Sequence, residues 1–152
     1  MLSRLNDRLE RAFGYVLAAL FAALILVVFL QVMARNVLEI PLIWTLDAAQ
    51  LLFSWCIFMG AALAFRKGEH YVVDLWPEHG GLTWIPAAVS LAVSAAVIFI
   101  LVNNGAAMSG IGLNRLSPSL GISEFWFFVP IPIAGVFMAL FLVERLLAGR
   151  GE

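Results

Sequence analysis

The sequence has few of the groups on which soluble proteins and most enzymes depend. Only 12% of its 152 residues are charged and 63% are hydrophobic, against about 25% and about 45–50% in soluble domains. With a net charge of −1, it offers no basic surface for nucleic acid. Its single cysteine, Cys56, excludes a thiol oxidoreductase that works through cysteine pairs within the chain. These absences predict an integral membrane protein.

Motifs for catalysis and for ion coupling are absent from the sequence as well. It contains no phosphate-binding loop, no metal-ligand spacing and no nucleophile beside a base, so we expect no cofactor and no enzymatic activity. No Asp, Glu, Lys, Arg or His lies deep within a long apolar run, which disfavours a proton relay or a midplane ion site. The pattern favours an auxiliary subunit over a complete pump.

Four apolar runs predict an all-α membrane protein with four transmembrane helices in a single domain, residues 1–152. The expected spans are residues 12–34, 45–66, 82–106 and 125–143. The first has 23 uncharged residues, which is too long for a signal-peptide core. In the fourth, Pro130 and Pro132 each remove a backbone donor, so a kink or a pair of freed carbonyls is expected there.

Charge placement predicts the orientation. Seven of the nine Lys and Arg residues lie at the amino end, in the loop 66–81 or at the carboxyl end, and cytoplasmic loops carry the excess of these residues. Both termini are therefore expected in the cytoplasm. The segment 1–13 has apolar residues at helical spacing between charges, which predicts a short interfacial amphipathic segment.

The stretch from Trp44 to Asp74 carries the most information. Asp47, Gln50 and Ser54 fall at i, i+3 and i+7 on one helix face. They either bond to neighbouring backbone or face another polypeptide, and the leading carboxylate favours the second alternative. Small residues four apart allow close helix approach, and a tryptophan fixes the depth of the helix. The predicted subunit-interface residues are Trp44, Asp47, Gln50, Ser54, Gly60 and Ala64.

A second polar group follows this helix. If the loop after residue 67 forms a brief helix, Arg66, His70 and Asp74 fall four residues apart and could pair. Alternatively, the segment is a solvated loop with an ordinary titrating histidine. We place these three residues at a cytoplasmic contact.

The order and spacing of several short motifs resemble those of a known family. The chain is similar to the small membrane subunit of tripartite ATP-independent periplasmic (TRAP) transporters, the DctQ-like family, over nearly its whole length. The motifs are Trp44 with Asp47, GAALAFR from Gly60, Arg66 with His70 and Asp74, SPSLGIS from Ser117, and VPIPIAG from Val129. Members often carry paired acids after the tryptophan, whereas here Asp47 is followed by Ala48, so this chain lacks the second acid.

The resemblance implies a non-catalytic permease subunit in the lipid bilayer of the bacterial inner membrane. Its partners would be a large, DctM-like membrane subunit that holds the substrate and sodium sites and a DctP-like periplasmic binding protein that delivers an organic acid. The small subunit would brace the large one and help to dock the binding protein. The outer-surface docking residues are predicted to be Glu39, Ser117, Pro118 and Glu124. The alternative is a self-assembling four-helix transporter or channel, lined by the row from Asp47 to Ser54.

Overall fold

The computed structural model describes the backbone of residues 2–67 and 84–148, and the side chains of residues 11–65 and 89–144. The helices are α1 (Leu2–Asn36), α2 (Trp44–Lys67), α3 (Trp84–Gly112), α4 (Phe125–Phe128) and α5 (Pro130–Ala148). Four stretches of these residues are long and apolar enough to cross a membrane: Arg11–Asn36, Trp44–Phe65, Val89–Gly112 and Phe125–Glu144. The predicted all-α membrane fold with four spans is confirmed.

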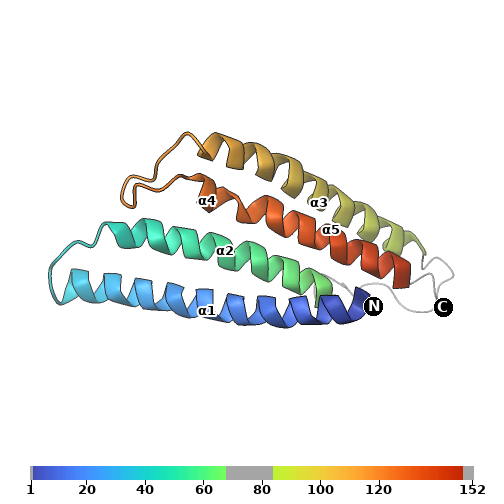
Figure 1. The fold of residues 1–152 in the computed structure, drawn as a ribbon, viewed down its shortest axis with the longest axis horizontal. Coiled ribbons are helices and arrows are strands. Elements are labelled where there is room, and N and C mark those ends of the chain that lie inside the picture. The colour runs from blue at the N-terminus through green and yellow to red at the C-terminus, as the bar shows by residue number, and fades with distance from the viewer. Residues whose placement is uncertain (1, 68–83, 149–152) are drawn as a thin grey trace.

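The long helices lie side by side in a row, in the order α1, α2, α5 and α3 (Figure 1). The last helix of the chain therefore lies between α2 and α3, and α1 and α3 form the two edges. At one end of the row, the ring of Phe13 in α1 meets the ring of Phe137 in α5 edge-on, with centroids 4.5 Å apart. Because the row is one helix thick along most of its length, it has two broad faces instead of an enclosed core.

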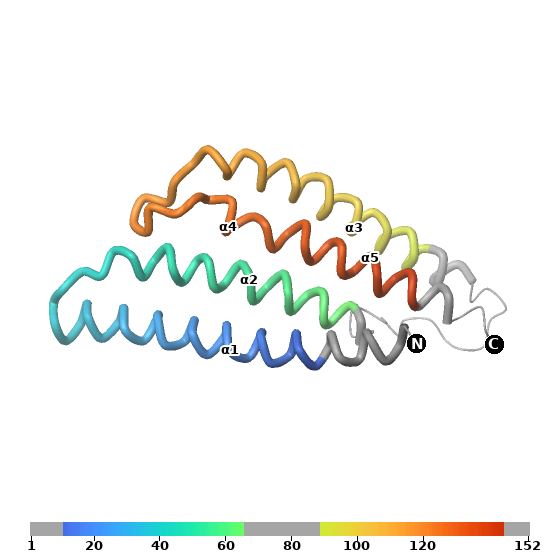
Figure 2. The backbone as a smooth tube through the Cα atoms, viewed as in Figure 1, coloured from blue at the N-terminus to red at the C-terminus, as the bar shows by residue number. Residues whose placement is uncertain are grey.

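Along the direction of its helices, the row has two ends, and these differ in what they contain. The α1–α2 link, residues 37–43, and the α3–α4 link, residues 113–124, lie together at one end, which we name the loop end (Figure 2). The start of α1 and the end of α5 lie at the other end, which we name the terminal end. These two links thus share a side, and the start of the first helix and the end of the last helix lie on the opposite side.

Burial is sparse and follows the order of the row. The hydrophobic cluster around Ala62, Ala134 and Met138 lies where α2 meets α5. In the fourth span, formed by α4 and α5, a third of the residues in the most apolar part are buried. In the most apolar part of α1, none are buried. Large exposed apolar side chains cover the remaining surface, among them Phe21, Phe29 and Phe99. A surface of this kind is stable in lipid but not in water.

The helices α3 and α5 approach closely, and this approach depends on glycine. A Cβ atom at Gly105 would lie 2.8 Å from Cγ2 of Ile131 and 2.9 Å from the backbone nitrogen of Pro132. At Gly135, it would lie 2.9 Å from Cγ2 of Val102. These distances are shorter than carbon atoms tolerate, so the two helices can meet this closely only where the side chain is a hydrogen atom.

Three boundaries differ from the sequence prediction. The amphipathic segment 1–13 is not separate but the start of α1, whose 35 residues are about 52 Å long at 1.5 Å per residue. The helix α3 extends to Gly112 instead of ending near residue 106. Within it, the Asn103 side chain donates to the Phe99 carbonyl, 3.0 Å away. The fourth span is divided at Val129 into α4 and α5.

The division of the fourth span confirms the interruption predicted from Pro130 and Pro132. Val129 itself keeps helical angles, with φ −58° and ψ −27°, so the chain continues in nearly the same direction. The residues predicted for a cytoplasmic contact lie outside the described part of the chain. This applies to the side chain of Arg66 and to all of His70 and Asp74.

Candidate functional site

The polar residues of the loop end are organised by Asp47. Asp47 lies in the first turn of α2, where a carboxylate complements the positive end of the helix dipole. Its Oδ2 atom accepts a hydrogen bond from the hydroxyl of Ser117 and a second, 2.9 Å long, from the backbone N–H of Ser119. The buried Ser117 oxygen also accepts a bond from the N–H of Leu120, 3.3 Å away. One carboxylate on α2 thereby holds the turn 117–121 that follows α3.

The turn 117–121 also closes on itself. The N–H of Ser117 donates to the carbonyl of Ile122 at 2.8 Å, and the N–H of Gly121 donates to the carbonyl of Ser117 at 3.1 Å. Gly121 has a φ of +66°, which glycine adopts without the steric cost that a Cβ atom brings. The result is a defined turn that exposes Pro118 at its surface.

Ser123 and an ion pair connect this turn to the neighbouring helices. The Ser123 hydroxyl donates to the carbonyl of Gly112 at 2.9 Å and accepts from the N–H of Phe125 at 3.2 Å. It therefore satisfies a carbonyl at the end of α3 and an N–H at the start of α4. Arg115 and Glu124 form an ion pair of 3.5 Å, which lies at the surface and contributes little to stability.

A second pair of bonds joins α2 to α4. The Ser54 hydroxyl donates to the carbonyl of Phe127 at 2.7 Å, and the indole N–H of Trp55 donates to the carbonyl of Trp126 at 3.1 Å. Pro130 has no N–H, so the carbonyl four residues before it, that of Trp126, loses its helical donor. The freed carbonyl predicted from the prolines is thus present, and Trp55 on the adjacent helix satisfies it.

A small polar pocket lies at the loop end, beside Asp47. Its volume is about 100 Å³. It is lined by Asp47, Gln50, Ser117, Pro118, Glu124, Phe127 and Phe128. Residues predicted for a subunit interface therefore line the same pocket as residues predicted for docking on the outer surface, because the bond from Ser117 to Asp47 draws the α3–α4 link over the start of α2.

The structure places the predicted interface residues in different surroundings. Asp47 and Ser54 bond to other parts of this chain, whereas Gln50 between them is exposed. Trp44 is 42% exposed. Gly60 faces α1, where an added Cβ would lie an ordinary 3.8 Å from Leu17. Contact of these residues with a second protein stays a prediction.

The remaining predicted residues lie in α2 and in the α1–α2 link. Ala64 is half-buried, and Glu39 is exposed in the α1–α2 link with a φ of +53°. Ser119 and Trp55 were not singled out from the sequence. The sequence does contain a signal for the role of Trp55, because Pro130 frees a backbone carbonyl and such a carbonyl requires a hydrogen-bond donor in a membrane. Ser119 acts through its backbone N–H, which no side-chain pattern reveals.

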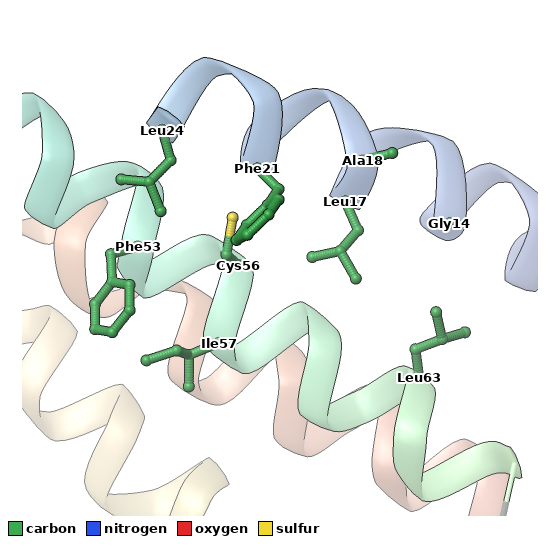
Figure 3. A pocket seen from close by; sticks show the side chains of 9 residues that line it. All are labelled: Gly14, Leu17, Ala18, Phe21, Leu24, Phe53, Cys56, Ile57 and Leu63. Carbon is green, nitrogen blue, oxygen red and sulfur yellow. The ribbon is translucent and has the colours of Figure 1, made fainter. Parts of the chain in front are cut away.

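An apolar hollow of about 530 Å³ lies between α1 and α2 (Figure 3). Leu17 and Phe21 of α1 and Phe53 and Ile57 of α2 contribute to its walls, and Cys56 is the one lining residue with a heteroatom in its side chain. A hollow with this lining offers no hydrogen bond or charge to a polar solute. It therefore does not qualify as a solute-binding site.

Comparison with known proteins identifies the chain's relatives. The family model described as "Tripartite ATP-independent periplasmic transporters, DctQ component" matches residues 24–150. The chain is 27% identical over 151 residues to the sialic acid TRAP transporter small permease protein SiaQ of Vibrio cholerae serotype O1, an alignment that covers 96% of this chain and 84% of SiaQ.

A second relative is a longer protein. The chain is 29% identical over 142 residues to the sialic acid TRAP transporter permease protein SiaT of Haemophilus influenzae strain 86-028NP. This alignment covers 91% of the chain but only 22% of SiaT. The resemblance noted from the motifs is confirmed, and four apolar helices with this kinship indicate a multi-pass membrane protein. The chain belongs to the DctQ family, the small membrane components of tripartite ATP-independent periplasmic transporters.

Proposed function

We propose that this chain is the non-catalytic small subunit of a TRAP permease that braces a large membrane subunit during ion-coupled uptake of an organic acid. The observation that carries the proposal is the family match over residues 24–150. The architecture supports it, because a row of helices one layer thick has no interior in which a solute could cross. Relatives named for sialic acid transport make a sugar acid the first substrate to test.

The loop end supports a second part of the proposal, the docking of a periplasmic binding protein. Asp47 and the turn 117–121 form a defined surface in which Pro118 and Gln50 are exposed. The excess of Lys and Arg at the opposite side of the chain favours a periplasmic loop end and cytoplasmic termini. In this proposal, Asp47 positions the docking surface, and Gln50 is the member of its row that is free to contact a partner.

The bonding pattern weighs against a self-assembling pore. A pore lined by the row from Asp47 to Ser54 needs these polar side chains to face water. Both end members of the row instead bond to the α3–α4 link and to α4 of the same chain. The proposed subunit role requires no such exposure.

The test is affinity purification of the tagged full-length chain from membranes of its source organism in mild detergent. We expect a stoichiometric partner that mass spectrometry identifies as a large TRAP permease chain. Recovery of the chain alone, or only with copies of itself, contradicts the proposal and leads to flux assays in proteoliposomes. Alkaline phosphatase fused after Ala148 tests the orientation, since it is inactive in the cytoplasm and active in the periplasm.

A further inference from the structure

Two amide side chains lie within the third membrane span, on its exposed side. Asn103 and Asn104 are both exposed. The helix that contains them runs from Trp84 to Gly112, so Asn103 lies about 8 Å from its midpoint and about 14 Å from its end at Gly112, at 1.5 Å per residue. A hydrocarbon layer about 30 Å thick that is centred on this helix includes both amides.

Within the described residues, these amides are not fully satisfied by their own chain. The Asn103 amide donates to the Phe99 carbonyl of the same helix, 3.0 Å away, which leaves its oxygen and a second N–H without a bond. In the part of the chain that the structure describes, no hydrogen bond reaches the Asn104 side chain. Water is absent from the hydrocarbon layer, so amides exposed there are costly unless another protein covers them.

The side of α3 that carries these amides faces away from the row. At about 100° per residue, Asn103 lies opposite Gly105, which packs against α5. Ala96 and Ala107 share the outward side with Asn103 and are exposed too. Small residues around an asparagine suit the close approach of a second transmembrane helix, whose groups can then bond to the amides.

The other edge of the row has no comparable feature. Residues 16–30 of α1 include no polar side chain, and none of the most apolar part of this span is buried. This edge is suited to lipid. The asymmetry indicates that a protein partner lies beside α3.

We infer that a transmembrane helix of the large permease subunit packs along the outward side of α3 and hydrogen-bonds to Asn103 and Asn104. The choice of partner rests on the proposed function and on the relative SiaT, in which the matched region is 22% of one longer permease chain. In that relative, a single small segment accompanies the remainder of the chain, so a one-to-one pair with a larger protein fits better than a second copy.

The first test replaces both amides with leucine. In the Asn103→Leu/Asn104→Leu variant, we expect the amount of large permease chain captured with the tagged small chain to fall by about fivefold or more, since helix-to-helix amide bonds are lost. The isolated variant in detergent is expected to be at least as stable as the original, because leucine is the better residue in lipid. The matched control, Asn103→Gln/Asn104→Gln, keeps the amides and is expected to restore capture.

The outcomes separate this inference from the proposed function. If the original chain captures the large subunit and the leucine variant captures it equally, the inference is overturned and the subunit role stands. If the original chain captures no large subunit, the subunit role fails first. In the complex, a photo-crosslinking phenylalanine analogue in place of Ala107 is expected to attach to the large subunit. Attachment only to lipid, or to another copy of this chain, overturns the choice of partner.

Discussion

Replacement of Gly105 by alanine tests the close contact between α3 and α5. The added methyl group would lie 2.8 Å from Cγ2 of Ile131 and 2.9 Å from the backbone nitrogen of Pro132. Unlike a side chain, a backbone atom cannot rotate away, so α5 must shift. Overpacking of this kind costs about 1–3 kcal/mol, and alanine regains about 0.8–1.0 kcal/mol of helix propensity. Because the clash includes backbone, we expect Gly105→Ala to lower the free energy of unfolding by about 1–2 kcal/mol.

The control is the same substitution on the same helix at an open position. A Cβ atom at Gly110 meets nothing within 4 Å, so Gly110→Ala is expected to leave stability unchanged or to raise it by up to about 1 kcal/mol. Unfolding of the isolated chain in mild detergent, followed by circular dichroism during titration with sodium dodecyl sulfate, measures both variants. If Gly105→Ala is as stable as the original chain, or if both variants shift alike, the α3–α5 contact is not as close as described.

Two further predictions concern the loop end and the α2–α4 contact. Asp47→Leu is expected to speed hydrogen exchange of the backbone amides in the turn 117–121, measured by mass spectrometry, whereas Asp47→Asn, which keeps an acceptor, changes it less; equal exchange in both variants would contradict the role of the carboxylate. Trp55→Phe is expected to cost about 0.5–1.5 kcal/mol of stability, and less in a Pro130→Ala background, where a new N–H can donate to the Trp126 carbonyl. Additive losses in the double variant would refute that account.

The helical architecture was predictable because one physical constraint governs it. In a bilayer every backbone polar group needs a partner within its own segment, so long apolar runs such as residues 12–34 become helices. The interruption near Pro130 follows from the same constraint, since a proline removes a known donor. Both features depend on local sequence alone.

The contacts between segments could not be predicted in the same way. The row of Asp47, Gln50 and Ser54 correctly indicates a shared helix face, but the partners of Asp47 lie 70 and 72 residues away, at Ser117 and Ser119. Their approach depends on which helices become neighbours. Asn103 shows a related difficulty, because an asparagine is a signal for a helix end in water and is tolerated inside a helix when its side chain bonds to the preceding turn.

The order of the helices has a consequence for how the protein is made. Since α5 lies between α2 and α3 (Figure 1), one of the two inner helices of the row leaves the ribosome last. Until then, the helix that begins at Trp84 has no long neighbour among the described helices, and α2 is joined to the following segments by the loop-end bonds of Asp47, Ser54 and Trp55. A chain that stops before Pro130 therefore keeps the bonds of the loop end but lacks the helix that packs between α2 and α3, so these two helices gain their contact along the bilayer only when synthesis is complete.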